Sequence, residues 1–229
     1  MESRKPLSTL ISPTCKLDKD EKGTNIDQRL YREIIGSLLY LTASRPNILF
    51  SMCMCAMFQS NLKESHIIIA KRIIRYLKGT SNLGLWYSKD SSPNLIGYSD
   101  VDYGGCKIDK KSISDICQFL GSNLISWHSK KQSSVALSTA EVEYVAVESY
   151  CAQMLWIKQQ LEDYGMSQNK ILIKCDNTSA INILNKHIEI RNHFIRVHIQ
   201  NKNIILEFVP IEDQLAGIFM KPLNGDRFE

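Results

Sequence analysis

The sequence predicts an α/β fold, in which a mixed five-stranded sheet with flanking helices follows a helical region. Residues 28–78 place apolar side chains at helical spacing, and short strand-like segments alternate with helices from residue 95 onward. Between them, at residues 79–93, Gly, Ser, Asn and Pro accumulate. Hydrophobic residues make up 44% of the 229 positions, which is enough for a sizeable core and argues against global disorder.

The first part of the chain is predicted to be a leader followed by three helices. Residues 1–27 are polar and contain two prolines, so we expect an extended leader there. Helices are expected at Gln28–Ala43, at Asn47–Gln59 after Pro46, and at Lys63–Lys78. The third helix carries a basic stripe at i, i+4 and i+7, which is either a solvated face or a surface for phosphate groups. The stripe consists of Lys71, Arg75 and Lys78.

We place a domain boundary at about residue 90, where the texture of the sequence changes. The expected domains are the leader 1–27, a helical region 28–90, an α/β domain 91–223 and a tail 224–229. Helices packed on a mixed sheet are the expected architecture of the third region. Its predicted elements are strands at Leu95–Tyr103, Ile116–Gly121 and Leu124–Ser129, a helix at Thr139–Tyr164 capped by Ser138 or Thr139, a strand at Lys170–Cys175, helices at Asn177–Asn185 and Ile188–Gln200, a strand at Asn203–Val209 and a helix at Glu212–Phe219.

Charge and composition narrow the class of function. Residues 1–94 carry 14 basic and 8 acidic side chains, whereas residues 95–229 carry 14 and 16, so the first part suits a polyanion and the second a divalent cation. The seven cysteines include no Cys-x-x-Cys pair, so we expect reduced thiols rather than a zinc site. No apolar run reaches the length of about 20 residues that spans a bilayer, and the first residues do not resemble a signal peptide. We therefore expect an intracellular protein that does not contact membranes.

Three acidic residues occupy places where carboxylates can converge. Asp100 lies toward the end of a predicted strand, Glu143 at the start of the long helix and Asp176 at the end of another strand. Hydrolysis of a phosphodiester by two divalent ions needs several carboxylates around one point. Asp102 shares the face of Asp100 and is either a spare ligand or a loop residue. Glu141 lies about 200° round the helix from Glu143, so only one of the two is expected to face the site.

The sequence around these acids resembles a known family. Residues 28–223 are similar to the C-terminal part of the Pol polyprotein of plant copia-type retrotransposons, with a reverse transcriptase remnant followed by a ribonuclease H domain. The resemblance rests on Tyr31-Arg32-Glu33-Ile34-Ile35-Gly36-Ser37-Leu38-Leu39-Tyr40-Leu41, Ala70-Lys71-Arg72-Ile73-Ile74-Arg75-Tyr76-Leu77-Lys78-Gly79-Thr80, Gly97-Tyr98-Ser99-Asp100, Trp127-His128-Ser129-Lys130-Lys131-Gln132, Ala136-Leu137-Ser138-Thr139-Ala140-Glu141 and Cys175-Asp176-Asn177.

The resemblance implies a ribonuclease H-like fold, a function and a set of site residues. The family's ribonuclease H cleaves the RNA strand of an RNA–DNA hybrid with Mg²⁺, or Mn²⁺, held by four acidic residues. By motif, Asp100, Glu143 and Asp176 are the first three catalytic metal ligands. Contacts to the hybrid are expected from Lys130, Lys131, Gln132 and Ser138, with ordinary surface lysines as the alternative interpretation of Lys130 and Lys131. The upstream reverse transcriptase is a possible partner, and the expected location is the cytoplasm, in a virus-like particle, or the nucleus.

Three departures from the family indicate impaired catalysis. Gly217 stands where the family has its fourth acidic residue, and the segment before Lys186 is shorter than the family's. Ile113, Asp115 and Val142 also differ from the residues expected there, and no Tyr-x-Asp-Asp-type polymerase motif occurs. The expected function is thus an ancestral hybrid ribonuclease, weakened here, without polymerase activity. The alternatives are an inactive nucleic-acid-binding domain and a pseudogene product.

Overall fold

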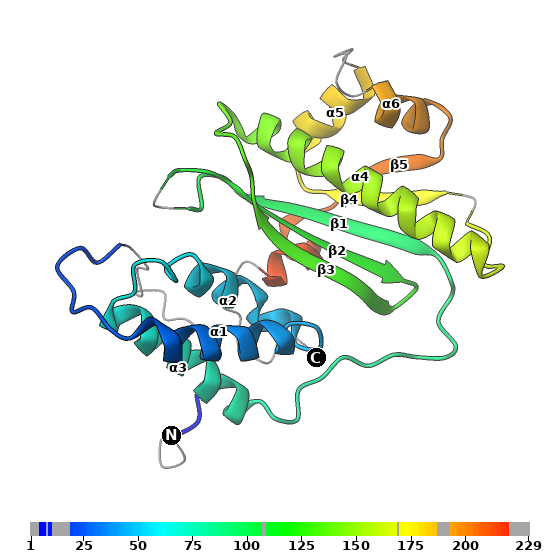
Figure 1. Cartoon of the computed structure of the whole chain (residues 1–229). Helices are drawn as coiled ribbons and strands as arrows, with labels where there is room; N and C mark the ends of the chain where they lie inside the picture. The colour runs from blue at the N-terminus through cyan, green and yellow to red at the C-terminus, as the bar shows by residue number, and fades with distance from the viewer. Residues whose placement is uncertain are drawn as a thin grey trace. The chain divides into compact units, whose positions relative to one another are not determined.

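The computed structural model describes residues 5–7, 9–10, 19–106, 109–168, 170–186 and 193–219. The chain forms two compact units, Met1–Leu85 with Ile218–Glu229 and Trp86–Gly217, which are described separately below. Figure 1 shows a helical first unit and a second unit built on a sheet. Among the described residues, no helix combines the length and apolar character needed to cross a membrane.

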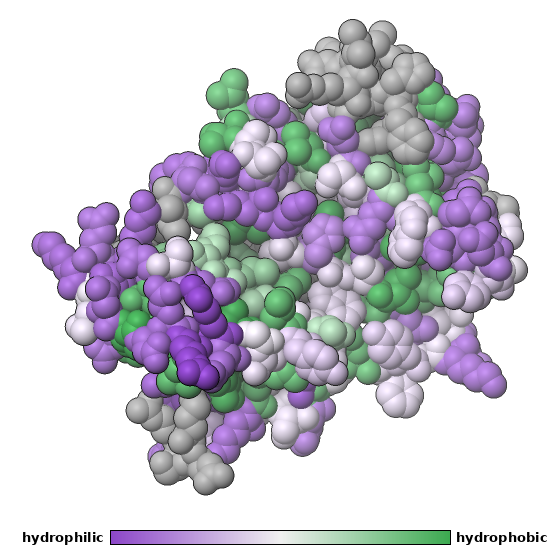
Figure 2. Space-filling view, viewed as in Figure 1, coloured by the Kyte–Doolittle hydropathy of each residue, from purple (hydrophilic) through white to green (hydrophobic). Residues whose placement is uncertain are grey.

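Three helices and one 3-10 turn build the helical unit. Helix α1 (Gln28–Leu41) starts at Asp27, whose carboxylate accepts a hydrogen bond from the Arg29 amide at 2.9 Å. The 3-10 turn η1 (Pro46–Ile48), α2 (Leu49–Ala56) and α3 (Glu64–Gly79) follow. The buried Tyr31 hydroxyl donates to the Cys55 carbonyl at 2.8 Å and thereby fastens α1 to α2. Figure 2 shows hydrophilic residues over the N-terminal part of α1, as expected for an amphipathic helix with one outer face.

Part of the predicted leader packs against α3. The Leu10 side chain is buried, and its carbonyl accepts a hydrogen bond from Arg72 Nε at 2.9 Å. The Leu7 amide donates to the Arg75 carbonyl at 3.2 Å, and Arg75 Nε donates to the Lys5 carbonyl at 3.0 Å. Leu10 therefore belongs to the core of the helical unit, and the backbone around it is tied to α3, which the polar sequence context did not indicate.

The second unit contains one mixed sheet of five strands, in the order β3-β2-β1-β4-β5. Strand β1 pairs antiparallel with β2, and β2 with β3, whereas β4 pairs parallel with both β1 and β5. This arrangement confirms the predicted fold class. The elements are β1 (Leu95–Asp102), β2 (Ile113–Leu120), β3 (Asn123–Lys131), α4 (Thr139–Asp163), β4 (Ile171–Cys175), α5 (Thr178–Lys186), α6 (His193–Gln200), β5 (Ile204–Phe208), η3 (Ile211–Asp213) and η4 (Leu215–Phe219).

Helix α4 lies along one face of the sheet and supplies much of its core (Figure 1). Val147, Tyr150 and Met154 are fully buried at helical spacing. The Tyr150 hydroxyl donates to the Cys117 carbonyl at 2.9 Å, and a Cβ at Gly97 would overlap the Tyr150 ring. Glycine at position 97 thus allows the middle of α4 to approach β1 closely.

Two boundaries differ from the sequence prediction in a way that matters for the site. Strand β2 begins at Ile113 rather than at Ile116, so it includes Asp115. The final helix, expected at Glu212–Phe219, consists of the two 3-10 turns η3 and η4. The helix expected at Ile188–Gln200 is α6 from His193 onward, and residues 187–192 lie outside the described part of the chain.

Candidate metal centre

The topology places the three predicted ligands near the same ends of neighbouring elements. Asp100 lies on β1, Asp176 directly follows β4, and Glu143 is in the second turn of α4. Strands β1 and β4 run parallel with Ser99 opposite Cys175, so Asp100 and Asp176 come one residue after a paired position. Carboxyl ends of adjacent parallel strands are a common place for a site in α/β folds.

Glu143 and Asp176 come close together, with Cys175 between them. Ligand atoms of these three residues lie within 4.8 Å of one another, and they form the metal-capable cluster found among the described residues. Cys175 Sγ donates to Glu143 Oε2 at 3.7 Å. Burial, followed by the charges of Asp176 and Asp100, raises the pKa of Glu143 to about 8, although the Val101 amide also donates a hydrogen bond to it.

Asp100 is coupled to this cluster by charge, but its carboxylate is not part of it. Because Gly97 faces Tyr150 of α4, the alternation of side chains along β1 directs Asp100 to the opposite face of the sheet. Asp100 is buried, with 8% of its surface exposed. The structure therefore divides the predicted ligands into a pair beside α4 and a single carboxylate on the other face of β1.

Gly217 lies directly beside Asp100. A Cβ built at position 217 would lie 2.9 Å from Asp100 Oδ2. The segment is held against β1 by Gln214, whose Nε2 donates to the Ser99 carbonyl at 2.8 Å and whose Oε1 accepts from the Ala216 amide at 3.3 Å. The position predicted to have lost its carboxylate is thus next to the first predicted ligand.

The other acids near position 217 are placed differently. Glu212 and Asp213 are exposed on η3, and neither belongs to a cluster of ligand atoms in the described residues. Glu141 is exposed and accepts a hydrogen bond from the Leu137 amide at 2.7 Å, so its role is at the start of α4. Glu143, and not Glu141, faces the site, as the helical rotation predicted. Asp102 is half-buried at the end of β1, and its carbonyl accepts from the Gly105 amide at 3.2 Å.

A carboxyl group that the sequence prediction did not include lies opposite Asp100. Asp115 pairs with Asp100 in the register of β1 and β2 and is completely buried. Burial raises its pKa to about 7, and Asp100 and Asp102 add to that effect, while Ser129 lowers it. The predicted strand began one residue too late to include it, because Ser114 and Asp115 interrupt the alternation that signals a strand.

The donor set fits a hard divalent cation. Carboxylate oxygens are the ligands that Mg²⁺ and Mn²⁺ prefer. Cys175 is the one soft donor of the cluster, and burial together with the charge of Glu143 raises the pKa of its thiol, so it stays protonated. Glu143 and Asp176 could hold one such ion, and Asp100, on the other face of β1, could take part in holding a second.

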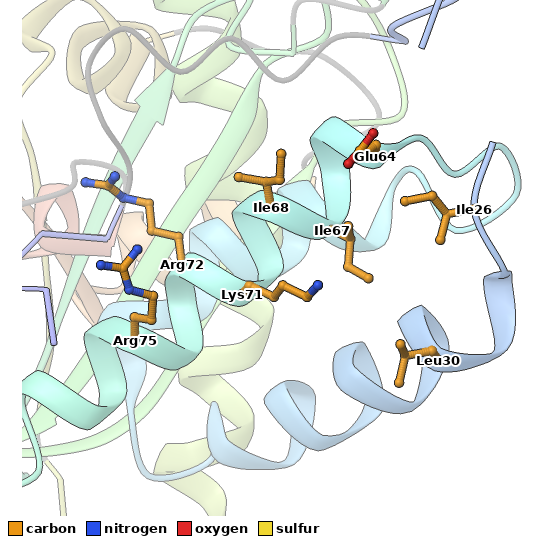
Figure 3. Close-up of a pocket in the computed structure, with 8 residues that line it drawn as sticks. All are labelled: Ile26, Leu30, Glu64, Ile67, Ile68, Lys71, Arg72 and Arg75. Carbon is orange, nitrogen blue, oxygen red and sulfur yellow. The ribbon is translucent and has the colours of Figure 1, made fainter. Parts of the chain in front are cut away.

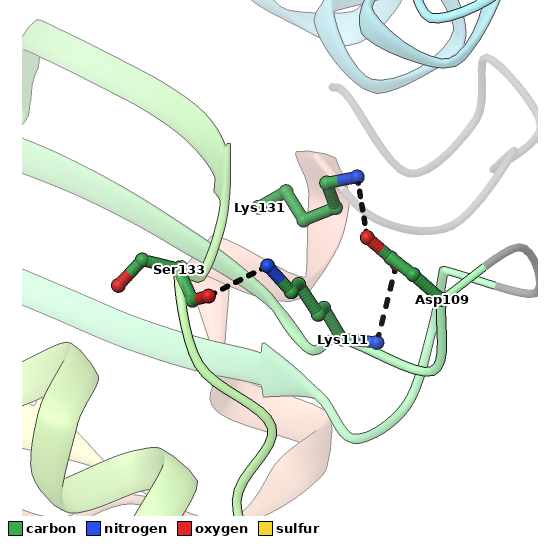
Figure 4. Close-up of polar contacts among 4 residues, drawn as sticks. All are labelled: Asp109, Lys111, Lys131 and Ser133. Carbon is green, nitrogen blue, oxygen red and sulfur yellow. Dashed lines mark hydrogen bonds and ion pairs between the residues drawn. The ribbon is translucent and has the colours of Figure 1, made fainter.

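The predicted nucleic-acid contacts on β3 have structural partners. Lys131 Nζ lies 2.9 Å from Asp109 Oδ2, and Lys111 next to it donates to the Ser133 carbonyl at 2.6 Å (Figure 4). Lys130 is exposed. Gln132 Nε2 donates to the Ser114 hydroxyl at 2.9 Å and to the Val142 carbonyl at 3.0 Å, which ties β2 to the start of α4.

The remaining predicted contact near the site, Ser138, caps α4. Its hydroxyl accepts a hydrogen bond from the Glu141 amide at 3.2 Å. Ser138 is nevertheless exposed, so the capping bond leaves its hydroxyl proton free for a further acceptor.

The basic stripe of α3 borders a cavity of about 570 Å³ within the helical unit. In Figure 3, Ile67 and Lys71 extend toward Leu30 of α1. Arg75, the second member of the stripe, holds the Lys5 carbonyl, and Lys78 is exposed at the end of the helix. The stripe is therefore partly engaged with the N-terminal segment rather than being only a solvated face.

Comparison with known proteins identifies relatives along the whole chain. No protein-family model matches. The chain is 36% identical over 238 residues to the "Retrovirus-related Pol polyprotein from transposon RE1" of Arabidopsis thaliana, and 32% identical over 245 residues to that from transposon TNT 1-94 of Nicotiana tabacum. All of this chain is covered, but only 16% and 18% of these relatives, so the chain spans less than a fifth of their length.

Solved structures resemble the chain more weakly. LC11-RNase H1 matches with a TM-score of 0.41 and 12% identity, over 56% of this chain and 92% of that one. A foamy viral protease-reverse transcriptase in complex with dsDNA matches with a TM-score of 0.44 and 13% identity, over 84% of this chain and 41% of that one. At these TM-scores, structural similarity carries no argument about function.

Proposed function

This chain belongs to the retrovirus-related Pol polyproteins of plant copia-type retrotransposons, and on that premise we propose that its α/β unit is a ribonuclease H-type domain. The proposed substrate is the RNA strand of an RNA–DNA hybrid, and the proposed cofactor is Mg²⁺ or Mn²⁺. The observation that carries the proposal is the pair of Glu143 and Asp176, whose ligand atoms lie within 4.8 Å of one another next to the strand that bears Asp100.

Each of these residues has a distinct part in the proposed site. When bound, divalent ions activate a water molecule and stabilise the leaving oxygen of a phosphodiester. Asp176 is half-buried, whereas Glu143 is buried and holds a proton until a cation replaces it. The buried environment strengthens every charge interaction in the site, so each missing carboxylate weakens cation binding considerably.

We propose that the activity is weak because position 217 supplies no carboxylate. Gly217 adjoins Asp100 Oδ2, so an acidic side chain there would place its oxygens beside that ligand. The Asp100 carboxylate is the end of a side chain and can rotate away by the few tenths of an ångström that a new Cβ requires. Gly217→Asp should therefore restore cleavage rather than disrupt the fold.

A cleavage assay on a labelled RNA–DNA hybrid tests this function. The parent chain, Gly217→Asp and Asp176→Asn are compared with Mg²⁺ and with Mn²⁺, after circular dichroism has shown that each is folded. We expect slow cleavage by the parent, an increase of about tenfold or more in Gly217→Asp, and none in Asp176→Asn. Folded parent and Gly217→Asp proteins that both leave the hybrid intact would contradict the proposed activity.

Hybrid binding is the second component of the proposal. Lys130 and the Lys131 side chain project from the end of β3, and Gln132 and Ser138 flank the first turn of α4. An A-form-like hybrid is recognised through its phosphates and 2′-OH groups. Binding to such a surface should weaken linearly with the logarithm of salt concentration, and its absence at low salt would contradict this part of the proposal.

A further inference from the structure

We propose that Asp115 is a ligand of the divalent-metal site and, together with Asp100, supplies the carboxylate pair that position 217 no longer completes. This inference rests on the proposed function, because it concerns the same metal site. Asp115 lies outside the set of acids that the family motifs identify.

Strand register places the two carboxylates side by side. Asp100 and Asp115 are directly opposite each other in the antiparallel pair β1–β2. Directly opposed residues project to the same face of a sheet, with Cβ atoms about 4.5–5.5 Å apart. Asp102 projects to that face as well, since it lies two residues beyond Asp100. Three carboxyl groups thus gather on the face of β1 that looks away from α4.

Burial dominates the environment of the Asp115 carboxyl group. None of its surface is exposed, and among the described residues neither carboxyl oxygen has a hydrogen-bond partner of standard geometry, although the nearby Ser129 of β3 lowers its pKa. An ionised carboxylate in such a place is costly unless a cation or several donors neutralise it. A divalent cation bound between Asp115 and Asp100 would neutralise both carboxylates.

Asp100 adjoins position 217, where no side chain is present. A Cβ built there would lie 2.9 Å from Asp100 Oδ2. Glu212 and Asp213 are exposed on η3, and Cys175 belongs to the cluster with Glu143 and Asp176. Asp115 is therefore the acid best placed to take part with Asp100 in holding a cation.

Binding of Mn²⁺ to the full-length chain tests this assignment directly. Titration calorimetry and the Mn²⁺ electron paramagnetic resonance signal measure affinity without any need for cleavage. We expect Asp115→Asn to weaken Mn²⁺ binding by about tenfold or more. Asp163→Asn, the same substitution at the far end of α4, is the matched control and should bind like the parent.

The outcomes separate this inference from the proposed function. If Asp115→Asn binds like the parent while Asp176→Asn binds weakly, the metal site stands and the role of Asp115 is refuted. If Asp176→Asn, Glu143→Gln and Asp115→Asn all bind like the parent, the metal site itself is refuted, and the proposed function with it.

Two further variants guard against a purely structural effect. Asp115→Ser removes the charge with a smaller side chain, and it should weaken binding as Asp115→Asn does if the carboxylate is a ligand. Adding Gly217→Asp to Asp115→Asn should restore affinity, because it returns a carboxylate to the side of Asp100. A folded double variant that still binds as weakly as Asp115→Asn would refute the idea that the two positions substitute for each other.

Discussion

Replacing Asp115 with asparagine should stabilise the protein in a pH-dependent way when no metal is present. The pKa of Asp115 is raised from 3.8 to about 7, mainly because the side chain is buried. A carboxyl group whose pKa is higher in the folded state than in the unfolded state lowers the free energy of unfolding as pH rises. At high pH the group is ionised, and its charge is unfavourable in the buried site but well solvated in the unfolded chain. The cost is absent below pH 3.8, grows as pH rises and is complete above about pH 7.

The magnitude follows from the pKa shift. Each unit corresponds to 1.36 kcal/mol, and half of the group is still protonated at pH 7, so the parent should lose about 2 kcal/mol relative to Asp115→Asn between pH 5 and pH 7. Urea unfolding followed by circular dichroism at several pH values, in the presence of a chelator, measures this difference. The unpaired asparagine amide adds a cost of about 1–3 kcal/mol, but that cost does not vary with pH. A stability difference between the two proteins that is the same at pH 5 and pH 7 would show that Asp115 is not buried as a titrating carboxyl group.

Three further changes test the packing and the surface. Gly97→Ala should lower the free energy of unfolding in urea by about 3 kcal/mol or more, because the new Cβ meets the Tyr150 ring. Its control, Gly36→Ala, lies in open space on α1 and should be neutral or stabilising. Equal effects of the two substitutions would contradict the close approach at position 97. Gln132→Ala should lower the free energy of unfolding by about 1–3 kcal/mol, since it breaks both bonds between β2 and the start of α4; an unchanged midpoint would show that these bonds contribute little. Lys131→Ala should change the free energy of unfolding by less than about 1 kcal/mol, because its ion pair with Asp109 is partly exposed. It should also reduce the slope of log affinity for the hybrid against log salt concentration by about one phosphate contact. An unchanged slope would show that Lys131 is not part of the binding surface.

The sequence was informative where local patterns and tertiary packing agree. Strand β1 was predicted to within one residue because apolar residues begin at Leu95, directly after the segment rich in Gly, Ser, Asn and Pro. The N-cap of α4 was found because Ser138 precedes an acidic first turn. In both cases the residues that set the local structure are neighbours in the chain, so a single sequence contains the information.

Contacts between residues far apart in the chain could not be predicted from the sequence. Asp115 was missed because the basic and polar residues before it resemble a loop, and only pairing with β1 makes them a strand. Likewise, Arg75 was predicted to lie on a solvated face or on a surface for phosphate groups, but its guanidinium donates to the Lys5 carbonyl, a partner 70 residues away. Contacts of this kind depend on the folded chain and leave no periodic signal.

Asp115 and position 217 are not equivalent replacements, because they approach Asp100 from different elements. Position 217 lies on the turn η4, where a side chain would project from outside the sheet, whereas Asp115 lies on a fully buried strand position. Binding a cation requires enough carboxylates, but two-ion hydrolysis also requires that they hold both ions in line with the phosphodiester. A carboxylate supplied from β2 can therefore restore metal affinity without restoring that geometry. The parent chain should therefore bind Mn²⁺ measurably and cleave the hybrid only slowly.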